Sequence, residues 1–200
     1  MKTTPLILLD AGHGVNTPGK QSPDGRLREY AYARRLVNEL QVQLRATGIP
    51  TFLVTPEKTD VPLALRVQRA NAAYVAHGRC GFLVSVHCNA AGCGQWMQAH
   101  GWSVHVDPAA SARSKAVAGC FFDAARVHGL TVRQQVPGQK YVVQPLYLCG
   151  RRAAYPAVLT ENLFQDNRQD VDFLLSPQGF HTLVEVHLLA LKSALALWQA

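Results

Sequence analysis

The stretch from Leu6 to Gly14, LILLDAGHG, constrains the fold more than any other part of the chain. Its four aliphatic residues, 6–9, have the length and composition of a short strand that is buried on both faces. The glycines that follow allow a sharp turn, which brings His13 out at the carboxyl end of this strand. Ligands bind at that edge of open α/β sheets. We therefore take His13 as the first fixed point of a site.

Apolar runs and amphipathic segments alternate along the rest of the chain, which is typical of the α/β class. We expect strands at 51–55, 80–87, 102–106, 141–149 and 157–160, and helices beginning at 27, 62, 111 and 176. The pattern predicts a single-domain three-layer fold with a mostly parallel, mixed central sheet of about six strands flanked by helices. No linker or repeat marks a boundary, so residues 1–200 are expected to form one domain.

Composition and charge exclude some classes of protein. Hydrophobic residues make up 48% of the chain and charged residues 16%, which excludes a disordered protein. No apolar run approaches the roughly 20 residues of a membrane span. The net charge of +7 favours an anionic partner. The basic pairs 34–35 and 151–152 lack interleaved aromatic residues, so we expect no nucleic-acid partner.

Four polar side chains hold similar positions next to buried elements. His13 follows an apolar strand, His87 and Glu161 end two others, and Glu29 begins a helix. Desolvated groups of this kind need partners. Two histidines and one carboxylate suit a catalytic zinc ion with a fourth position left for water. The remaining carboxylate would then take a proton from that water.

Taken singly, each of these side chains also has a structural interpretation. His13 could hydrogen-bond to Asp10, and Glu161 could pair with Arg151 or Arg152. Glu29 could be a first-turn carboxylate that the helix dipole stabilises. The histidine at the end of 80–87 could be a satisfied core residue.

The five cysteines offer no second kind of metal site. They stand at 80, 88, 93, 120 and 149, without a C-x-x-C pair. A zinc ribbon is excluded, and we expect buried free thiols rather than a disulfide framework. Cys88 lies beside His87, but neighbouring residues of a strand point to opposite faces. We therefore reject a Cys-His nucleophile.

Four blocks of this sequence resemble the signature blocks of the zinc-dependent N-acetylmuramoyl-L-alanine amidases of family 3, which act in cell-wall lysis. They are DAGHG at 10–14, LREY at 27–30, VSVHCNA at 84–90 and PAVLTENLFQDN at 156–167, in that family's order and spacing. The resemblance implies that His13, Glu29 and His87 bind Zn²⁺ and that Glu161 is catalytic. The bond cut would join N-acetylmuramic acid to L-alanine in peptidoglycan.

The resemblance and the loop 90–101 together suggest where substrate binds. We expect contacts from Asn89, Trp96, Trp102 and Arg66, with the loop forming one wall of a groove for peptidoglycan or a muropeptide. Two alternatives stay open: a zinc peptidase that cuts within the stem peptide, and a wall-binding module without catalysis.

Localisation is in conflict with this substrate. The first residues show no signal peptide, so the chain as given is expected to start in the cytoplasm or to have been trimmed. The substrate lies outside the cytoplasmic membrane. Release of a phage-type lysin, a trimmed signal or recycling of internalised fragments would each resolve the conflict.

Overall fold

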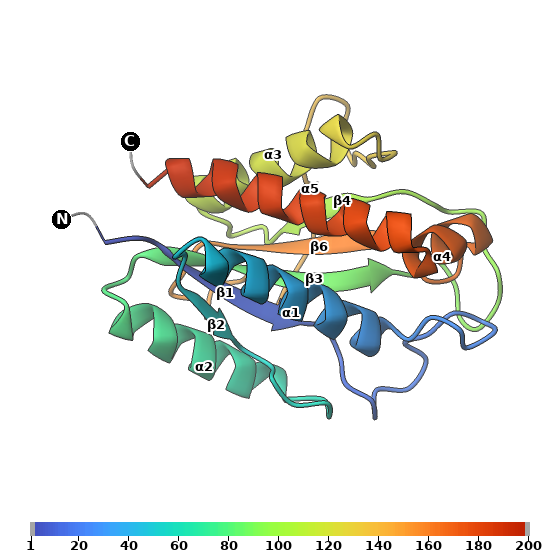
Figure 1. The fold of residues 1–200 in the computed structure, drawn as a ribbon, viewed down its shortest axis with the longest axis horizontal. Helices are drawn as coiled ribbons and strands as arrows, with labels where there is room; N and C mark the ends of the chain where they lie inside the picture. The colour runs from blue at the N-terminus through green and yellow to red at the C-terminus, as the bar shows by residue number, and fades with distance from the viewer. Residues whose placement is uncertain (1–2, 199–200) are drawn as a thin grey trace.

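The computed structural model describes residues 3–198 of the chain. Strands and helices alternate along most of this length (Figure 1). The elements in chain order are β1 (Leu6–Ala11), α1 (Glu29–Ala46), β2 (Thr51–Leu53), α2 (Leu63–Ala76), β3 (Gly81–Asn89), β4 (Ser103–Val106), α3 (Ala112–Val127), β5 (Val142–Val143), β6 (Ala157–Phe164), α4 (Arg168–Leu175) and α5 (Pro177–Ala196).

One mixed sheet of six strands, in the order β2-β1-β3-β6-β4-β5, forms the centre of the described fold. All neighbouring strands are parallel except β4 and β6, which are antiparallel. The predicted fold class is therefore confirmed. The register places Asp10 opposite Ser85, and His87 opposite Glu161.

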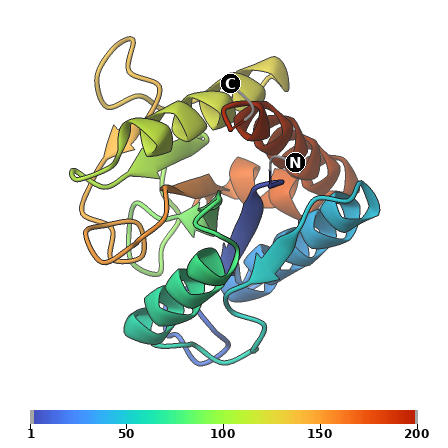
Figure 2. The same cartoon turned by 90° about the vertical axis from the view of Figure 1, so that its left-hand side faces the viewer.

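Helices cover both faces of the sheet, which gives the expected three layers. Helices α1, α3 and α5 lie on one face and α2 lies on the other (Figure 2). A hydrophobic core lies on each face of the sheet, and successive residues of β1 point alternately into one and the other. Ile7 and Leu9 pack toward α1 and α5, whereas Leu6 and Leu8 pack toward α2. This is the double burial that the aliphatic run predicts.

Three strands extend further toward the site than expected. Strand β1 includes Asp10, β3 continues to Asn89, and β6 continues to Phe164. His87 and Glu161, expected at the last positions of their strands, therefore lie a few residues inside the carboxyl ends. Their side chains gain the fixed orientation of a paired strand.

The predicted strand 141–149 is wrong for most of its length. Only Val142–Val143 pairs with the sheet, as β5. Pro145 lacks the N–H needed to continue a ladder. The next N–H, of Leu146, donates to the Asp107 carboxylate at 2.9 Å. This bond turns the chain away from the sheet, and residues 146–149 instead line a cavity.

Helix α4 was not predicted. The Asn167 side chain accepts the N–H of Asp170 at 3.1 Å, which is a regular N-cap. Ser176 separates α4 from α5, and its side chain caps α5 ahead of Pro177, as expected for that helix. The Asn-x-x-Asp spacing at 167–170 was the available signal.

A fully buried histidine links α5 to the sheet. His187 Nδ1 lies 2.8 Å from the Leu183 carbonyl oxygen, so this nitrogen donates, and Nε2 accepts from the Thr160 hydroxyl at 3.2 Å. Burial lowers the pKa of His187 to about 4, and the bond to Leu183 only partly opposes it. The ring is therefore neutral near pH 7.

We predict that His187 makes the protein acid-sensitive. The unfolded chain binds a proton near pH 6.5 and the folded chain only near 4, so stability falls as pH drops through this window. The loss from this one group is expected to reach about 3 kcal/mol. Urea unfolding of wild type and His187→Gln at pH 7.5, 6, 5 and 4.5 measures it.

The exposed His181 on the same helix provides the control. His181→Gln should keep the wild-type pH dependence, whereas His187→Gln should flatten it. Parallel stability curves for wild type and His187→Gln would contradict the prediction.

Candidate metal and catalytic site

The turn after β1 places His13 by means of two close backbone approaches. A Cβ at Gly12 would overlap the ring of His87, and a Cβ at Gly14 would overlap the backbone of Asp60. His13 itself has a φ of 57°, a left-handed conformation that is uncommon outside glycine. Such residues persist where the surroundings fix them, often at functional sites.

Glu29 enters the site as the first residue of α1. Its N–H donates to the Lys20 carbonyl oxygen at 3.0 Å, and Ser22 and Leu27 exchange two further bonds that close the preceding loop. Leu27 is buried in the core and anchors the loop from below. The carboxylate is consequently held in place although it is only 1% exposed.

The structure brings His13, Glu29 and His87 together from three distant parts of the chain. Glu29 Oε1 lies 3.4 Å from His13 Nε2 and 3.0 Å from His87 Nδ1. The candidate ligand atoms of the three residues all lie within 4.8 Å of one another. The two rings meet edge to face with their centroids 5.0 Å apart.

Glu29 and His87 shift one another's pKa values. Burial acts to raise the pKa of Glu29, but hydrogen bonds from His13 and His87 outweigh it and hold that pKa well below its usual value. Burial also acts to lower the pKa of His87, but the Glu29 carboxylate overrides it and raises that pKa. The second oxygen of Glu29 is buried and has no hydrogen-bond partner.

Glu161 faces the cluster from the neighbouring strand. It lies opposite His87 in the β3–β6 register, so the two side chains share a face of the sheet. One of its oxygens is buried without a partner. Burial, reinforced by the charge of Glu29, raises the pKa of Glu161 to about 7, against the opposing effects of His87 and Lys20. It does not hydrogen-bond to Arg151 or Arg152 among the contacts described, so that structural interpretation finds no support.

A cavity of about 590 Å³ opens beside the two histidines. Both polar and apolar side chains line it. Two segments, 61–63 before α2 and 146–149 after β5, supply most of the apolar lining, and Leu159 adds to it. No residue of the predicted groove wall, 90–101, lines this cavity. The contribution of 146–149 could not be predicted, because the apolar composition of that stretch is typical of a strand.

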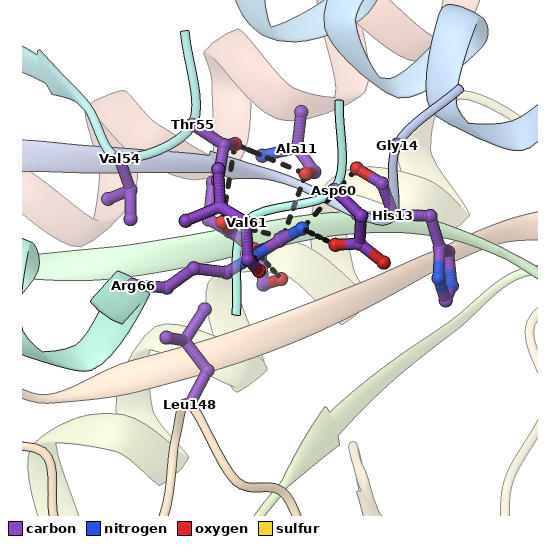
Figure 3. Close-up of polar contacts among 12 residues, drawn as sticks. Ala11, His13, Gly14, Val54, Thr55, Asp60, Val61, Arg66 and Leu148 are labelled. Carbon is purple, nitrogen blue, oxygen red and sulfur yellow. Dashed lines mark hydrogen bonds and ion pairs between the residues drawn. The ribbon is translucent and has the colours of Figure 1, made fainter. Parts of the chain in front are cut away.

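The predicted substrate contact of Arg66 is wrong, because this side chain is buried and fully hydrogen-bonded. The side chain is 2% exposed, and its five N–H groups already have acceptors (Figure 3). These are the carbonyl oxygens of Val61, Ala11 and His13 and the carboxylates of Asp10 and Asp60, at 2.7 to 3.3 Å. No donor is left for a substrate.

The predicted substrate contact of Trp102 is also wrong. Its side chain is fully buried, and its Nε1–H donates to the Asn162 side chain at 3.0 Å. A substrate would have no surface to touch. The alternating polarity at 102–106 places Trp102 on the same face as Val104 and Val106, and helix α3 covers this face.

The remaining two predicted contacts lie near the surface. Trp96 packs against the main core, and the Arg168 guanidinium covers its ring at 4.4 Å from the centroid. The N–H groups of Ala91 and Gly92 donate to the Asp166 carboxylate, which fixes the start of this loop. Asn89 is half-buried at the end of β3. Their role in substrate binding stays a prediction.

Cys88 contributes its backbone rather than its thiol. Its N–H donates to Glu29 Oε1 at 3.1 Å, while its side chain packs in the core on the opposite face of the sheet from the cluster. Burial raises the pKa of the thiol well above its usual value. Rejection of a Cys-His nucleophile agrees with this geometry. All five cysteines are free, and two of them are buried.

The fold is shared with solved cell-wall amidases. The N-acetylmuramoyl-L-alanine amidase from Clostridium difficile 630 superimposes with a TM-score of 0.82 at 20% identity, covering 97% of this chain and 98% of that one. The family model for N-acetylmuramoyl-L-alanine amidase, Amidase_3, matches residues 7–193. The chain therefore belongs to this family.

Two curated relatives add sequence similarity. The chain is 36% identical over 86 residues to the N-acetylmuramoyl-L-alanine amidase AmiC of Neisseria meningitidis, a match that covers 43% of this chain and 19% of AmiC. It is 24% identical over 184 residues to the endolysin of Bacillus phage SPP1, a match that covers 91% of this chain and 63% of the endolysin. The chain thus spans less than two thirds of either relative.

We predict that Gly12→Ala disturbs the site directly. The new Cβ would overlap the His87 ring, which is held by strand β3 and cannot move away freely. We expect a loss of about 1–3 kcal/mol in the free energy of unfolding, as for other overpacked positions. Urea denaturation measures it.

Gly119→Ala in the middle of α3 is the matched control. Its Cβ would approach only Lys140, at 3.9 Å, so the change should be neutral or stabilising by up to about 1 kcal/mol. Equal stability of Gly12→Ala and wild type would show that the close approach is not needed.

Proposed function

We propose that the chain is a zinc-dependent hydrolase of the amide bond between N-acetylmuramic acid and L-alanine in peptidoglycan. The observation that carries the proposal is the His13–Glu29–His87 cluster with Glu161 beside it at the edge of an apolar cavity. Membership of the amidase family supports the choice of bond.

The donor set fits zinc. Two imidazole nitrogens and one carboxylate oxygen form a three-ligand catalytic set, with room for a fourth ligand. The unpartnered second oxygen of Glu29 gives a buried acceptor without a donor, which suits a cation. When bound, zinc polarises the scissile carbonyl and lowers the pKa of a bound water.

Glu161 is proposed as the general base and then the general acid. A carboxyl group with a pKa near 7 can take a proton from water and return it to the departing amine. Glu29 cannot share this task, since its hydrogen bonds to the two histidines keep it ionised.

The cavity walls offer a place for the substrate. We propose that 61–63 and 146–149 pack against apolar parts of the stem peptide or the sugar, while Asn89 and Trp96 contact the substrate from the other side of the site. The partner is peptidoglycan or a muropeptide, and the place of action is the bacterial wall. In residues 3–198 no helix combines the length and hydrophobicity of a membrane span.

The product separates this proposal from its alternatives. An amidase releases an intact stem peptide with a free L-alanine amino group, which mass spectrometry of a digest identifies. A zinc peptidase leaves part of the peptide on the sugar. A wall-binding module without catalysis releases nothing.

We predict one zinc ion per chain. His13→Ala and His87→Ala should each reduce the bound zinc well below stoichiometry, because each removes one of three ligands. Metal analysis after dialysis measures this. His181→Ala changes an exposed histidine on α5 and should leave the zinc content unchanged. Full zinc occupancy in His87→Ala would refute the ligand assignment.

We predict that Glu161→Gln keeps the fold and the zinc but loses activity on the order of 10²–10⁴-fold, since the change removes the proton acceptor with little change in shape. Release of stem peptide from purified peptidoglycan is the readout. Glu185→Gln on α5 should retain activity. Wild-type turnover by Glu161→Gln would mean that another group is the base.

A further inference from the structure

A chain of buried polar groups runs from α2 to the proposed ligand His87. Arg66 Nη1 lies 3.1 Å from Asp10 Oδ1, and Asp10 Oδ2 lies 2.6 Å from the Ser85 hydroxyl. The same hydroxyl lies 3.2 Å from His87 Nε2. Arg66, Asp10 and Ser85 are each no more than 2% exposed. The register that sets Asp10 opposite Ser85 makes this contact possible.

The donor and the acceptor of each hydrogen bond from Arg66 to His87 follow from the chemistry of the groups. Asp10, paired with the Arg66 guanidinium, can only accept, so the single proton of the Ser85 hydroxyl points to Asp10. Ser85 Oγ must therefore accept from His87, and Nε2 must carry the proton. Nδ1, which faces Glu29 at 3.0 Å, is then the ring nitrogen left for a metal ion, and that ion would take the place of the proton that Nδ1 otherwise donates to Glu29.

We propose that Ser85, oriented by Asp10, is a positioning residue that fixes His87 in the tautomer whose Nδ1 binds the metal. The proposal rests on the zinc site of the proposed function. A ligand histidine commonly donates its second N–H to an oxygen that fixes the ring. Here a serine hydroxyl takes that place and passes the bond on to a carboxylate.

Arg66 connects this arrangement to the second histidine ligand. Its Nη2 donates to the His13 carbonyl oxygen at 3.3 Å, and Nη1 donates to Ala11 O at 3.0 Å (Figure 3). The guanidinium thus holds the turn that carries His13 and the carboxylate that orients Ser85. One buried side chain stabilises the approach of both histidines to Glu29.

The first measurement uses the wild-type protein loaded with zinc. Long-range ¹H–¹⁵N NMR of ¹⁵N-histidine-labelled protein should show His87 with a protonated Nε2 and a metal-bound Nδ1. Metal bound through Nε2, with a proton on Nδ1, would overturn the proposal even if every variant failed to fold.

The second measurement is the dissociation constant of zinc, from competition with a chromophoric chelator. Ser85→Ala leaves the His87 N–H without an acceptor and should weaken zinc binding about 10–100-fold. Ser114→Ala is the control, because Ser114 is also buried and accepts one backbone N–H, from Ala157 at 3.0 Å, but does not contact the cluster. It should lower the melting temperature without changing zinc affinity.

The outcomes separate the two proposals. Wild-type zinc affinity in Ser85→Ala, together with loss of zinc in His87→Ala, would overturn the role of Ser85 and leave the zinc site standing. A wild-type chain that binds no zinc would overturn both. A similar affinity loss in Ser85→Ala and Ser114→Ala would show a general effect of stability and overturn the positioning role.

Discussion

The site depends on one buried oxygen, Oε1 of Glu29. Two imidazole nitrogens and the N–H of Cys88 surround it at 3.0 to 3.4 Å. A carboxylate taken out of water is costly unless such partners are in place. The cluster is therefore stable only where the loop before α1, the turn after β1 and strand β3 are all in place.

The sheet sets the distances within this edge. Alternation along β3 directs Ser85 and His87 to the site and Cys88 to the core. Register then adds a partner from each side, Asp10 from β1 and Glu161 from β6. His87 and Glu161 both stand on paired strands. Such support holds reacting groups to a fraction of an ångström.

The sequence predicted the parallel core and the four central residues, because aliphatic runs that end in His or Glu are unusual and because the sheet brings their ends to one edge. The i, i+2 spacing of Ser85 and His87 on a predicted strand places both side chains on one face, so their contact follows from the sequence pattern. Burial of Trp102 depends on packing beneath α3, and the turn at 146–149 depends on a distant bond to Asp107. The alternation at 102–106 is a local pattern that turns Trp102 inward, whereas the turn at 146–149 leaves no local pattern. Arg66 was expected to contact substrate, and only the five acceptors around its guanidinium show that it supports the fold instead.

Two carboxyl groups on neighbouring elements of this site are driven to opposite protonation behaviour. Glu29 is buried and Glu161 is half-buried, and the loss of water around each carboxyl group would by itself raise its pKa. Glu29 receives hydrogen bonds from two histidines, which reverse the effect. Glu161 has an oxygen without any hydrogen-bond partner to offset burial, which raises its pKa to about 7. Environments that separate the pKa values of paired carboxyl groups also assign their roles. The ionised member suits a cation, and the member whose pKa lies near 7 suits the proton transfer proposed for it.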